Sequence, residues 1–296
     1  DCYFFIADYH AITTLKDAAQ VKTLVLEVAA TWLALGLDPE KAVFYRQSQV
    51  PEIFELNWIL SCSANKGLLN RAHAYKALVD QNTARQASAD DGINMGIFNY
   101  PVLMAADILM FGANQVPVGQ DQKQHVEIAR DIAETVNRHY SLDLPLPEPL
   151  IFENVKVVPG IDGRKMSKNY QNTIPIFEEP KPLRKQVMKI VTDSTPMEAP
   201  KDPDHCHVMA IYEAIASDNE VSALKQRYRT PGMGYGHAKQ ALFECLESRF
   251  EGPRERYKAL MANPNEIIAA LAKGEAHARK VAQATLAKVR AAIGID

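Results

Sequence analysis

Two lysines flank a Met-Ser pair in the segment Gly163–Asn169, which reads GRKMSKN. This segment, called the lysine loop below, contains a glycine and lies just beyond a predicted strand. A mobile loop with two ammonium groups can clamp a triphosphate and neutralise the charge that develops on departing pyrophosphate. Taken alone, a Lys-x-x-Lys loop is more often only a solvated surface.

A single carboxylate interrupts the apolar helical run Tyr100–Leu109, which reads YPVLMAADIL. A buried lone carboxylate is costly unless a partner satisfies it. Asp107 therefore either pairs structurally with a neighbouring element or accepts a hydrogen bond from a donor-only ligand group in an apolar slot. The indole N–H is a donor of this kind.

A third candidate site begins where a strand at Gln115–Val118 ends at Gly119 and a helix opens at Asp121. A glycine and an acid at such a junction suit a ribose and a substrate ammonium group. The alternative is an aspartate that caps the helix. His10 follows the apolar run Cys2–Ala7 at a similar strand end, although a lone histidine is more often a satisfied structural residue.

Short apolar runs that alternate with helical patterns must position these candidates. Helical spacing covers residues 15–35 and about 52–62, 67–80, 101–111 and 121–139. The runs expected as strands are Cys2–Ala7, Ala42–Tyr45, Gln115–Val118 and Val155–Val158. This alternation favours an α/β fold with a Rossmann-like, doubly wound parallel sheet. The stretch from about 50 to 100 shows helices and no convincing strand, so we expect a helical insertion there.

The strand signal stops after Ile174, and later apolar residues recur at helical spacing. The proline-rich stretch Pro175–Pro182 separates the two regions. We therefore predict an α/β catalytic domain at residues 1–175 and an all-helical domain at residues 176–296.

These segments resemble the tryptophanyl-tRNA synthetase family of class I aminoacyl-tRNA synthetases. KMSKN at Lys165–Asn169 is similar to the family's KMSKS signature, with Asn169 in place of the last serine. The run Tyr100–Leu109 resembles its amino-acid pocket, Gly119–Gln122 its G-x-D-Q segment, and Asp8–Thr13 also matches. The four segments occur in the family's order, and the resemblance covers essentially the whole chain.

The resemblance implies a role for each of these positions. It assigns the indole nitrogen of tryptophan to Asp107, the pocket wall to Met104 and the polar end of the substrate to Tyr100. Gln122 is implied to reach the amino acid. His10 is implied to lie near the substrate carboxylate or ATP. The implied ATP-binding residues are Gly119, Asp121, Gln122, Val157, Lys165, Met166, Ser167 and Lys168, among which Lys165, Ser167 and Lys168 are implied to be catalytic.

The resemblance also implies a two-step reaction. The tryptophan carboxylate attacks the α-phosphorus of ATP to give tryptophanyl-adenylate and pyrophosphate, and a ribose hydroxyl of tRNA(Trp) then takes the acyl group. Mg²⁺ is expected to accompany ATP, without a dedicated protein cage. The family is dimeric, with the insertion at about 50–100 as the natural interface, and its helical domain binds the anticodon.

One family segment is not found in the sequence. The family begins with a strand and an H-I-G-H-like segment that binds the ATP phosphates, and we expect such a segment to precede Asp1. Gly234–His237 is no substitute, because it lies in the helical half. A tyrosyl-type synthetase is the nearest alternative, and a catalytically inactive paralogue that binds tRNA is a second.

Composition limits the classes of partner. A formal net charge of −3 argues against a chain coated in nucleic acid but leaves room for a local basic patch that reads one folded RNA. Candidates for that patch are Arg254, Arg256, Lys258, Arg279 and Lys280.

The cysteines and the hydropathy favour a cytoplasmic protein. The four cysteines are far apart and form no Cys-x-x-Cys pair, which is typical of free thiols. We expect no structural metal, even at His205-Cys206-His207. No apolar run approaches the roughly 18 residues that a membrane span needs, so no membrane contact is expected.

Overall fold

The computed structural model describes residues 1–152 and 157–295, which form two compact units. Unit 1 combines Asp1–Phe152 with Asn263–Asp296, and unit 2 is Glu153–Ala262. The boundaries of these units differ from those of the predicted domains, which are residues 1–175 and 176–296. The lysine loop belongs to unit 2, and the C-terminal residues belong to unit 1.

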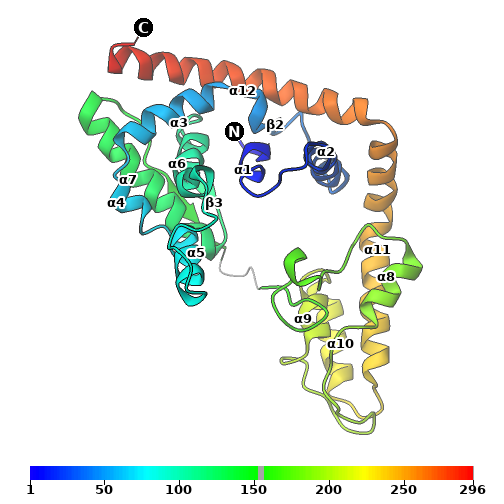
Figure 1. The fold of residues 1–296 in the computed structure, drawn as a ribbon. Coiled ribbons are helices and arrows are strands. Elements are labelled where there is room, and N and C mark those ends of the chain that lie inside the picture. Colours follow the sequence, from blue (N-terminus) through cyan, green and yellow to red (C-terminus); the bar gives the residue numbers. More distant parts are fainter. Residues whose placement is uncertain (153–156, 296) are drawn as a thin grey trace. The chain divides into compact units, whose positions relative to one another are not determined.

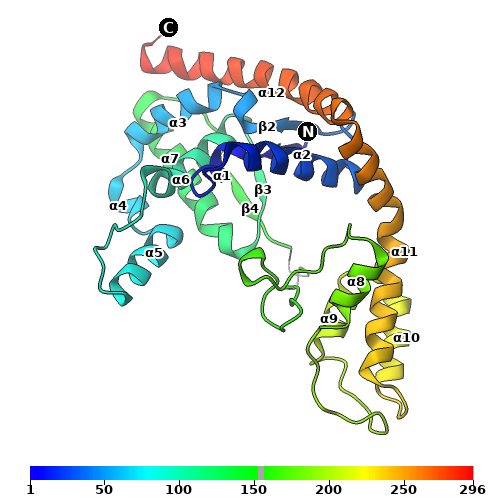
Figure 2. The same ribbon diagram turned by 45° about the vertical axis from the view of Figure 1, so that its right-hand side comes forward.

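Unit 1 contains two pairs of parallel strands, as expected for the α/β class. β1 (Tyr3–Ile6) pairs with β2 (Val43–Arg46), and β3 (Gln115–Pro117) pairs with β4 (Glu148–Leu150). Figure 2 shows β3 and β4 side by side, next to α7. The first three predicted strands are confirmed at nearly the expected residues.

β4 was not predicted from the sequence. It lies in the stretch LPLPEPL, where prolines without an N–H argue against a central strand. The strand predicted at Val155–Val158 falls partly on Val155 and Lys156, which lie outside the described residues, and Val157 and Val158 are in no strand.

The helices of unit 1 follow the apolar periodicity. Residues 50–100, all of them described, contain helices and no strand, as predicted for the insertion. The helices of unit 1 are α1 (Asp8–Ala11), α2 (Ala18–Ala34), α3 (Glu52–Ser63), α4 (Lys66–Leu69), α5 (His73–Ala84), α6 (Met95–Leu109), α7 (Lys123–Tyr140) and α12 (Pro264–Ile293), with the short 3-10 helices η1 (Gln47–Gln49) and η2 (Gln120–Gln122).

α6 lies at the centre of the core of unit 1. It packs against α3 and α7 and buries Val102, Ala105 and Ile108. Because this helix is largely apolar, its part from Pro101 to Leu109 is packed among other elements, whereas Met95 at its start is exposed. Asp107 is its only charged residue.

α12 completes unit 1 from the far end of the chain (Figure 1). It lies across β2, α2 and α3, and its Leu286 and Val289 are buried in the same core as α6. Gly274 allows the helix to approach β2, because a Cβ at that position would overlap the backbone of Phe44. Helical periodicity predicts this helix but not which core it packs against, so the prediction assigned it to the helical domain.

Unit 2 is helical in its described part, as predicted. Its core is formed by α11 against α8 and α9 and includes Leu183, Met209 and Leu242. Its helices are α8 (Pro180–Val187), α9 (His207–Glu213), α10 (Asp218–Tyr228) and α11 (Tyr235–Ala262), with the 3-10 helix η3 (Lys168–Tyr170). Within the described ranges of both units, no helix has the length and apolar character needed to cross a bilayer.

Replacing Gly274 with alanine should destabilise unit 1. The added methyl group would meet the backbone of β2, and overpacking of this kind costs about 1–3 kcal/mol. Urea unfolding followed by tryptophan fluorescence reports this unit, since Trp32 and Trp58 both belong to it. Gly67→Ala in α4 is the control, because a Cβ there meets open space. Equal stability of the two variants would contradict this account of α12.

Candidate active site

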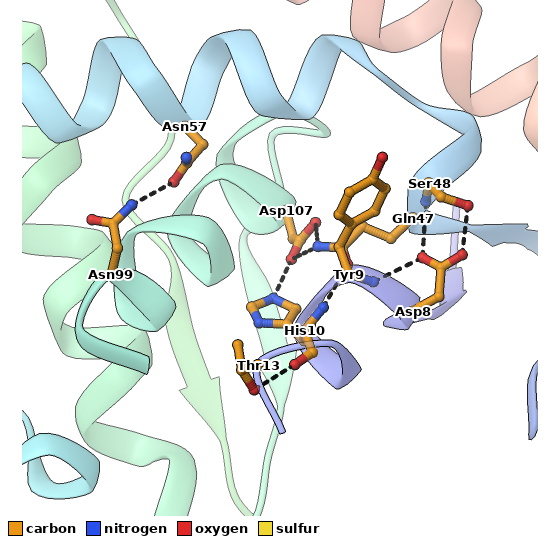
Figure 3. Close-up of polar contacts among 9 residues, drawn as sticks. All are labelled: Asp8, Tyr9, His10, Thr13, Gln47, Ser48, Asn57, Asn99 and Asp107. Carbon is orange, nitrogen blue, oxygen red and sulfur yellow. Dashed lines mark hydrogen bonds and ion pairs between the residues drawn. The ribbon is translucent and has the colours of Figure 1, made fainter. Parts of the chain in front are cut away.

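Asp107 is held by side chains from two strand ends (Figure 3). His10 of α1 follows β1, and Gln47 of η1 follows β2. His10 Nε2 lies 2.9 Å from Asp107 Oδ2, and the Gln47 amide donates to both carboxylate oxygens at 2.9 Å. The Asp107 side chain is only 1% exposed. These three residues are called the carboxylate cluster below.

Burial and hydrogen bonding have opposite effects on the Asp107 carboxyl in this cluster. Burial raises the pKa of the Asp107 carboxyl, and the bonds from His10 and Gln47 oppose that rise. When Asp107 is ionised its carboxylate only accepts, and His10 Nε2 then carries the shared proton. His10 Nδ1 is then left buried, without a partner among the described residues.

The hydrogen bonds of Asp107 are compatible with both interpretations of the sequence. The described residues donate three bonds to it, one from His10 and two from Gln47. An ionised carboxylate accepts about four. Asp107 therefore pairs structurally with neighbouring elements and keeps capacity for one further donor.

Tyr100 and Met104 lie on the same face of α6 as Asp107, because residues four and seven positions apart on a helix share a face. The Tyr100 ring packs between two histidines, with centroids 4.2 Å from His10 and 5.6 Å from His125. Burial raises the pKa of the Tyr100 phenol. This face therefore combines aromatic rings with a single charged acceptor.

Gly119 and Asp121 are exposed at η2, directly after β3. Asp121 makes no capping bond to the start of a helix, so the capping interpretation is wrong; it accepts a bond from the Gln122 amide at 3.4 Å. Gln122 Oε1 lies 2.9 Å from His125 Nδ1. The predicted Gly119–Gln122 segment thus ends in a contact to the histidine that packs against Tyr100.

Gln47 of the carboxylate cluster and its neighbour Ser48 were not singled out from the sequence. Gln47 completes the cluster, and Ser48 donates its N–H and its hydroxyl to Asp8 at 3.0 and 2.5 Å. The contacts to Asp8 tie the end of β1 to the end of β2 (Figure 3). The polar run after the predicted strand Ala42–Tyr45 was the available signal, since the same strand-end argument had identified His10.

The remaining predicted site residues belong to unit 2. Lys165 and Lys168 are exposed, and Val157 is 66% exposed. Met166 packs against the core of unit 2, and Ser167 is half-buried. The side chain of Asn169, which departs from the family signature, lies outside what the structure describes.

The predicted basic surface is partly neutralised by ion pairs. Arg254 is 3% exposed and pairs with Glu247, so its assignment to a solvent-facing patch is wrong. Lys258 pairs with Glu179. In unit 1, Arg279 pairs with Glu52 in the same way. The cause is local, because acidic side chains of neighbouring turns and helices lie within reach of these cations.

Comparison with known proteins identifies relatives along the whole chain. The family described as tRNA synthetases class I (W and Y) matches residues 1–251. A tryptophan–tRNA ligase of Bordetella parapertussis is 53% identical, over 100% of this chain and 66% of that protein. One of Neisseria meningitidis is 47% identical, over 100% of this chain and 88% of that protein. The chain thus spans about two thirds of the length of the Bordetella relative.

A solved structure agrees with these matches. The tryptophanyl-tRNA synthetase of Campylobacter jejuni, in complex with ADP and tryptophan, superposes with a TM-score of 0.87. It is 46% identical, and the match covers 98% of this chain and 88% of that one.

His125 should make unit 1 less stable in mild acid. Burial lowers the pKa of its imidazole below the usual 6.5, and the unfolded chain therefore takes up the proton first as the pH falls. Stability present above about pH 6.5 is lost as the pH falls toward the folded-state pKa. His125→Gln should reduce the difference in unfolding free energy between about pH 7.5 and about pH 5.5, measured by urea unfolding. His139→Gln, at an exposed position of the same helix, should keep the parental pH dependence.

Proposed function

The chain belongs to the class I tRNA synthetases of the tryptophan and tyrosine group, and we propose that within this family it is a tryptophan–tRNA ligase. Tryptophan is activated with ATP to tryptophanyl-adenylate and pyrophosphate, and the tryptophanyl group is then transferred to tRNA(Trp). The relatives named tryptophan–tRNA ligase support this choice. The observation that carries it is the buried Asp107 on the apolar helix α6.

Asp107 suits indole because indole presents one donor and no acceptor. A phenol would need a donor as well as an acceptor. His10 and Gln47 fix the carboxylate from two sides, so the acceptor is already oriented before the substrate arrives. Met104 supplies apolar wall on the same face, and Tyr100 and Gln122 meet the polar end of the amino acid.

The nucleotide is assigned to the strand end after β3 and to the lysine loop. Gly119 and Asp121 hold the ribose, and backbone near Val157 holds adenine. Met166 and Ser167 complete the ATP site between Lys165 and Lys168. Mg²⁺ enters as part of the nucleotide substrate.

Activation requires no covalent bond to the protein. A carboxylate oxygen of tryptophan forms a bond to the α-phosphorus while the bond to the bridging oxygen of pyrophosphate breaks. Lys165, Lys168 and the Ser167 hydroxyl stabilise the negative charge that the departing pyrophosphate gains. The rest of the catalytic effect is positioning.

The partners follow from the same proposal. tRNA(Trp) is the acyl acceptor, and the protein acts in the cytoplasm as a homodimer formed through the insertion at about 50–100. Within that insertion, Trp58 of α3 is 71% exposed and Met95 is 73% exposed. Large apolar side chains at this exposure suit an interface between two copies better than a solvated surface.

Tryptophan, and not tyrosine, should support ATP–pyrophosphate exchange. Asp107→Ala should weaken tryptophan binding by about 1.5–3 kcal/mol, the range for a hydrogen bond to a charged group, and leave ATP binding much less affected. The benzothiophene analogue of tryptophan, which lacks the N–H, should bind poorly to the parent and be nearly unaffected by the change. Equal exchange with tyrosine would refute the substrate assignment.

A structural role of Asp107 needs its own control, because the residue also holds His10 and Gln47. Gln47→Ala removes two of its hydrogen bonds and keeps the carboxylate. This variant should lower the melting temperature and still distinguish tryptophan from the analogue. If Asp107→Ala weakens both ligands equally, the coupling is zero and Asp107 does not contact the indole nitrogen.

Trp58→Glu should convert the dimer to a monomer, since a charge within an apolar interface would be buried without a partner. Sedimentation velocity at micromolar concentration measures this. Ile268→Glu, at an exposed apolar position of α12 outside the insertion, should leave the dimer intact. A dimer that survives the Trp58 change and is lost with the Ile268 change would place the interface elsewhere.

A further inference from the structure

We propose that Asn172 is the positioning residue of the lysine loop, and that it fixes the directions in which Lys165 and Lys168 project. The residue lies outside the KMSKN motif and has no ligand-like feature in the sequence. The inference rests on the proposed function, because the directions of two lysines matter to catalysis only if they act on ATP.

Asn172 is 1% exposed, and both the oxygen and the nitrogen of its side-chain amide are hydrogen-bonded. Its Oδ1 accepts from the backbone N–H of Ser167 at 2.7 Å. Its Nδ2 donates to the backbone carbonyl of Lys165 at 3.1 Å and to Asp162 Oδ1 at 2.7 Å. One buried amide thus holds the lysine loop at two points and the preceding residue Asp162 at a third.

Two of these points lie on either side of Met166. The Met166 N–H bonds to the carbonyl of Val158 at 3.0 Å, Pro159 and Lys165 form an antiparallel bridge, and the Met166 side chain packs against the core of unit 2. With methionine directed inward, Lys165 and Lys168 are exposed, and neither ammonium group has a partner among the described residues. The anchored backbone therefore presents two unpaired cations from a fixed frame.

Gly160 provides an independent sign that the loop is built around this amide. A Cβ at position 160 would overlap the side chain of Asn172 and come within 2.6 Å of its carbonyl oxygen. The Gly160 N–H also bonds to the carbonyl of Arg164 at 2.7 Å, which closes the loop at its base. The space that Asn172 occupies exists because residue 160 has no side chain.

The chemistry requires an amide at position 172. Alanine would leave the Ser167 N–H and the Lys165 carbonyl without their partner. Aspartate would keep the acceptor but place a second carboxylate against Asp162, whose pKa is held below its usual range by the hydrogen bond from Asn172. Only a group with both a donor and an acceptor satisfies all three contacts.

The test is steady-state ATP–pyrophosphate exchange by the intact protein. Asn172→Ala should lower kcat by roughly tenfold to a hundredfold, with the KM for tryptophan changed by less than about twofold, since misplaced charge stabilisers affect the transition state more than binding. Ser217→Ala is the control: it removes the capping box of α10 in the same unit, and should lower the melting temperature without lowering kcat.

A double-mutant cycle separates positioning from a general loss of structure. Lys165→Ala/Lys168→Ala should itself lower kcat strongly. If Asn172 acts through the lysines, Asn172→Ala should have almost no further effect in that background, whereas independent effects would multiply. Full multiplication, or an unchanged kcat for Asn172→Ala alone, would overturn the inference.

Asn172→Asp covers the case in which the alanine variant does not fold. It should lower kcat, and Asp162→Asn should restore part of the loss, because the new amide at position 162 can donate to the carboxylate at position 172. Absence of any restoration would count against the contact. A parent protein that shows no tryptophan-dependent exchange would instead refute the proposed function, so the two failures are distinguishable.

Discussion

The burial of one negative charge organises unit 1. A carboxylate inside an apolar helix is stable only where other elements bring donors to it, and Asp107 is reached by side chains that directly follow β1 and β2. The contacts of Asp8 with Ser48 tie the same two strand ends together. The polar end of the β1–β2 pair is thereby fixed against α6, and the rings of Tyr100 and His125 pack around that point.

The sequence was informative where a local pattern determines the outcome. Alternating apolar runs and helical spacing predicted the α/β class, three of the strands and the helices of the insertion. The lone carboxylate of the Tyr100–Leu109 run was recognisable as a residue in need of partners. Its partner Gln47 was missed, although its place directly after a predicted strand was an available signal; that it meets Asp107 depends on the pairing of β1 with β2.

Long-range packing explains the remaining differences. β4 was missed because Pro149 within it and the prolines just before it argue against a strand, although a short edge strand tolerates a proline. Arg254 was assigned to a basic surface because charge alone does not reveal that Glu247 lies beside it. Asn172 was overlooked for a similar reason. Its proposed positioning role depends on contacts with Asp162, Lys165 and Ser167 that form only in the folded loop.

The return of α12 to unit 1 has a consequence for synthesis on the ribosome. Unit 2 is continuous in sequence, so all of its residues have been made by residue 262. Unit 1 lacks Leu286 and Val289 of its core until the whole of unit 2 has been made. Unit 1, whose first residues precede unit 2 in the sequence, therefore finishes folding after unit 2, and its exposed apolar surface must be kept from aggregating while unit 2 is translated. Protease treatment of ribosome-arrested chains would check this order, with unit 2 becoming resistant before unit 1.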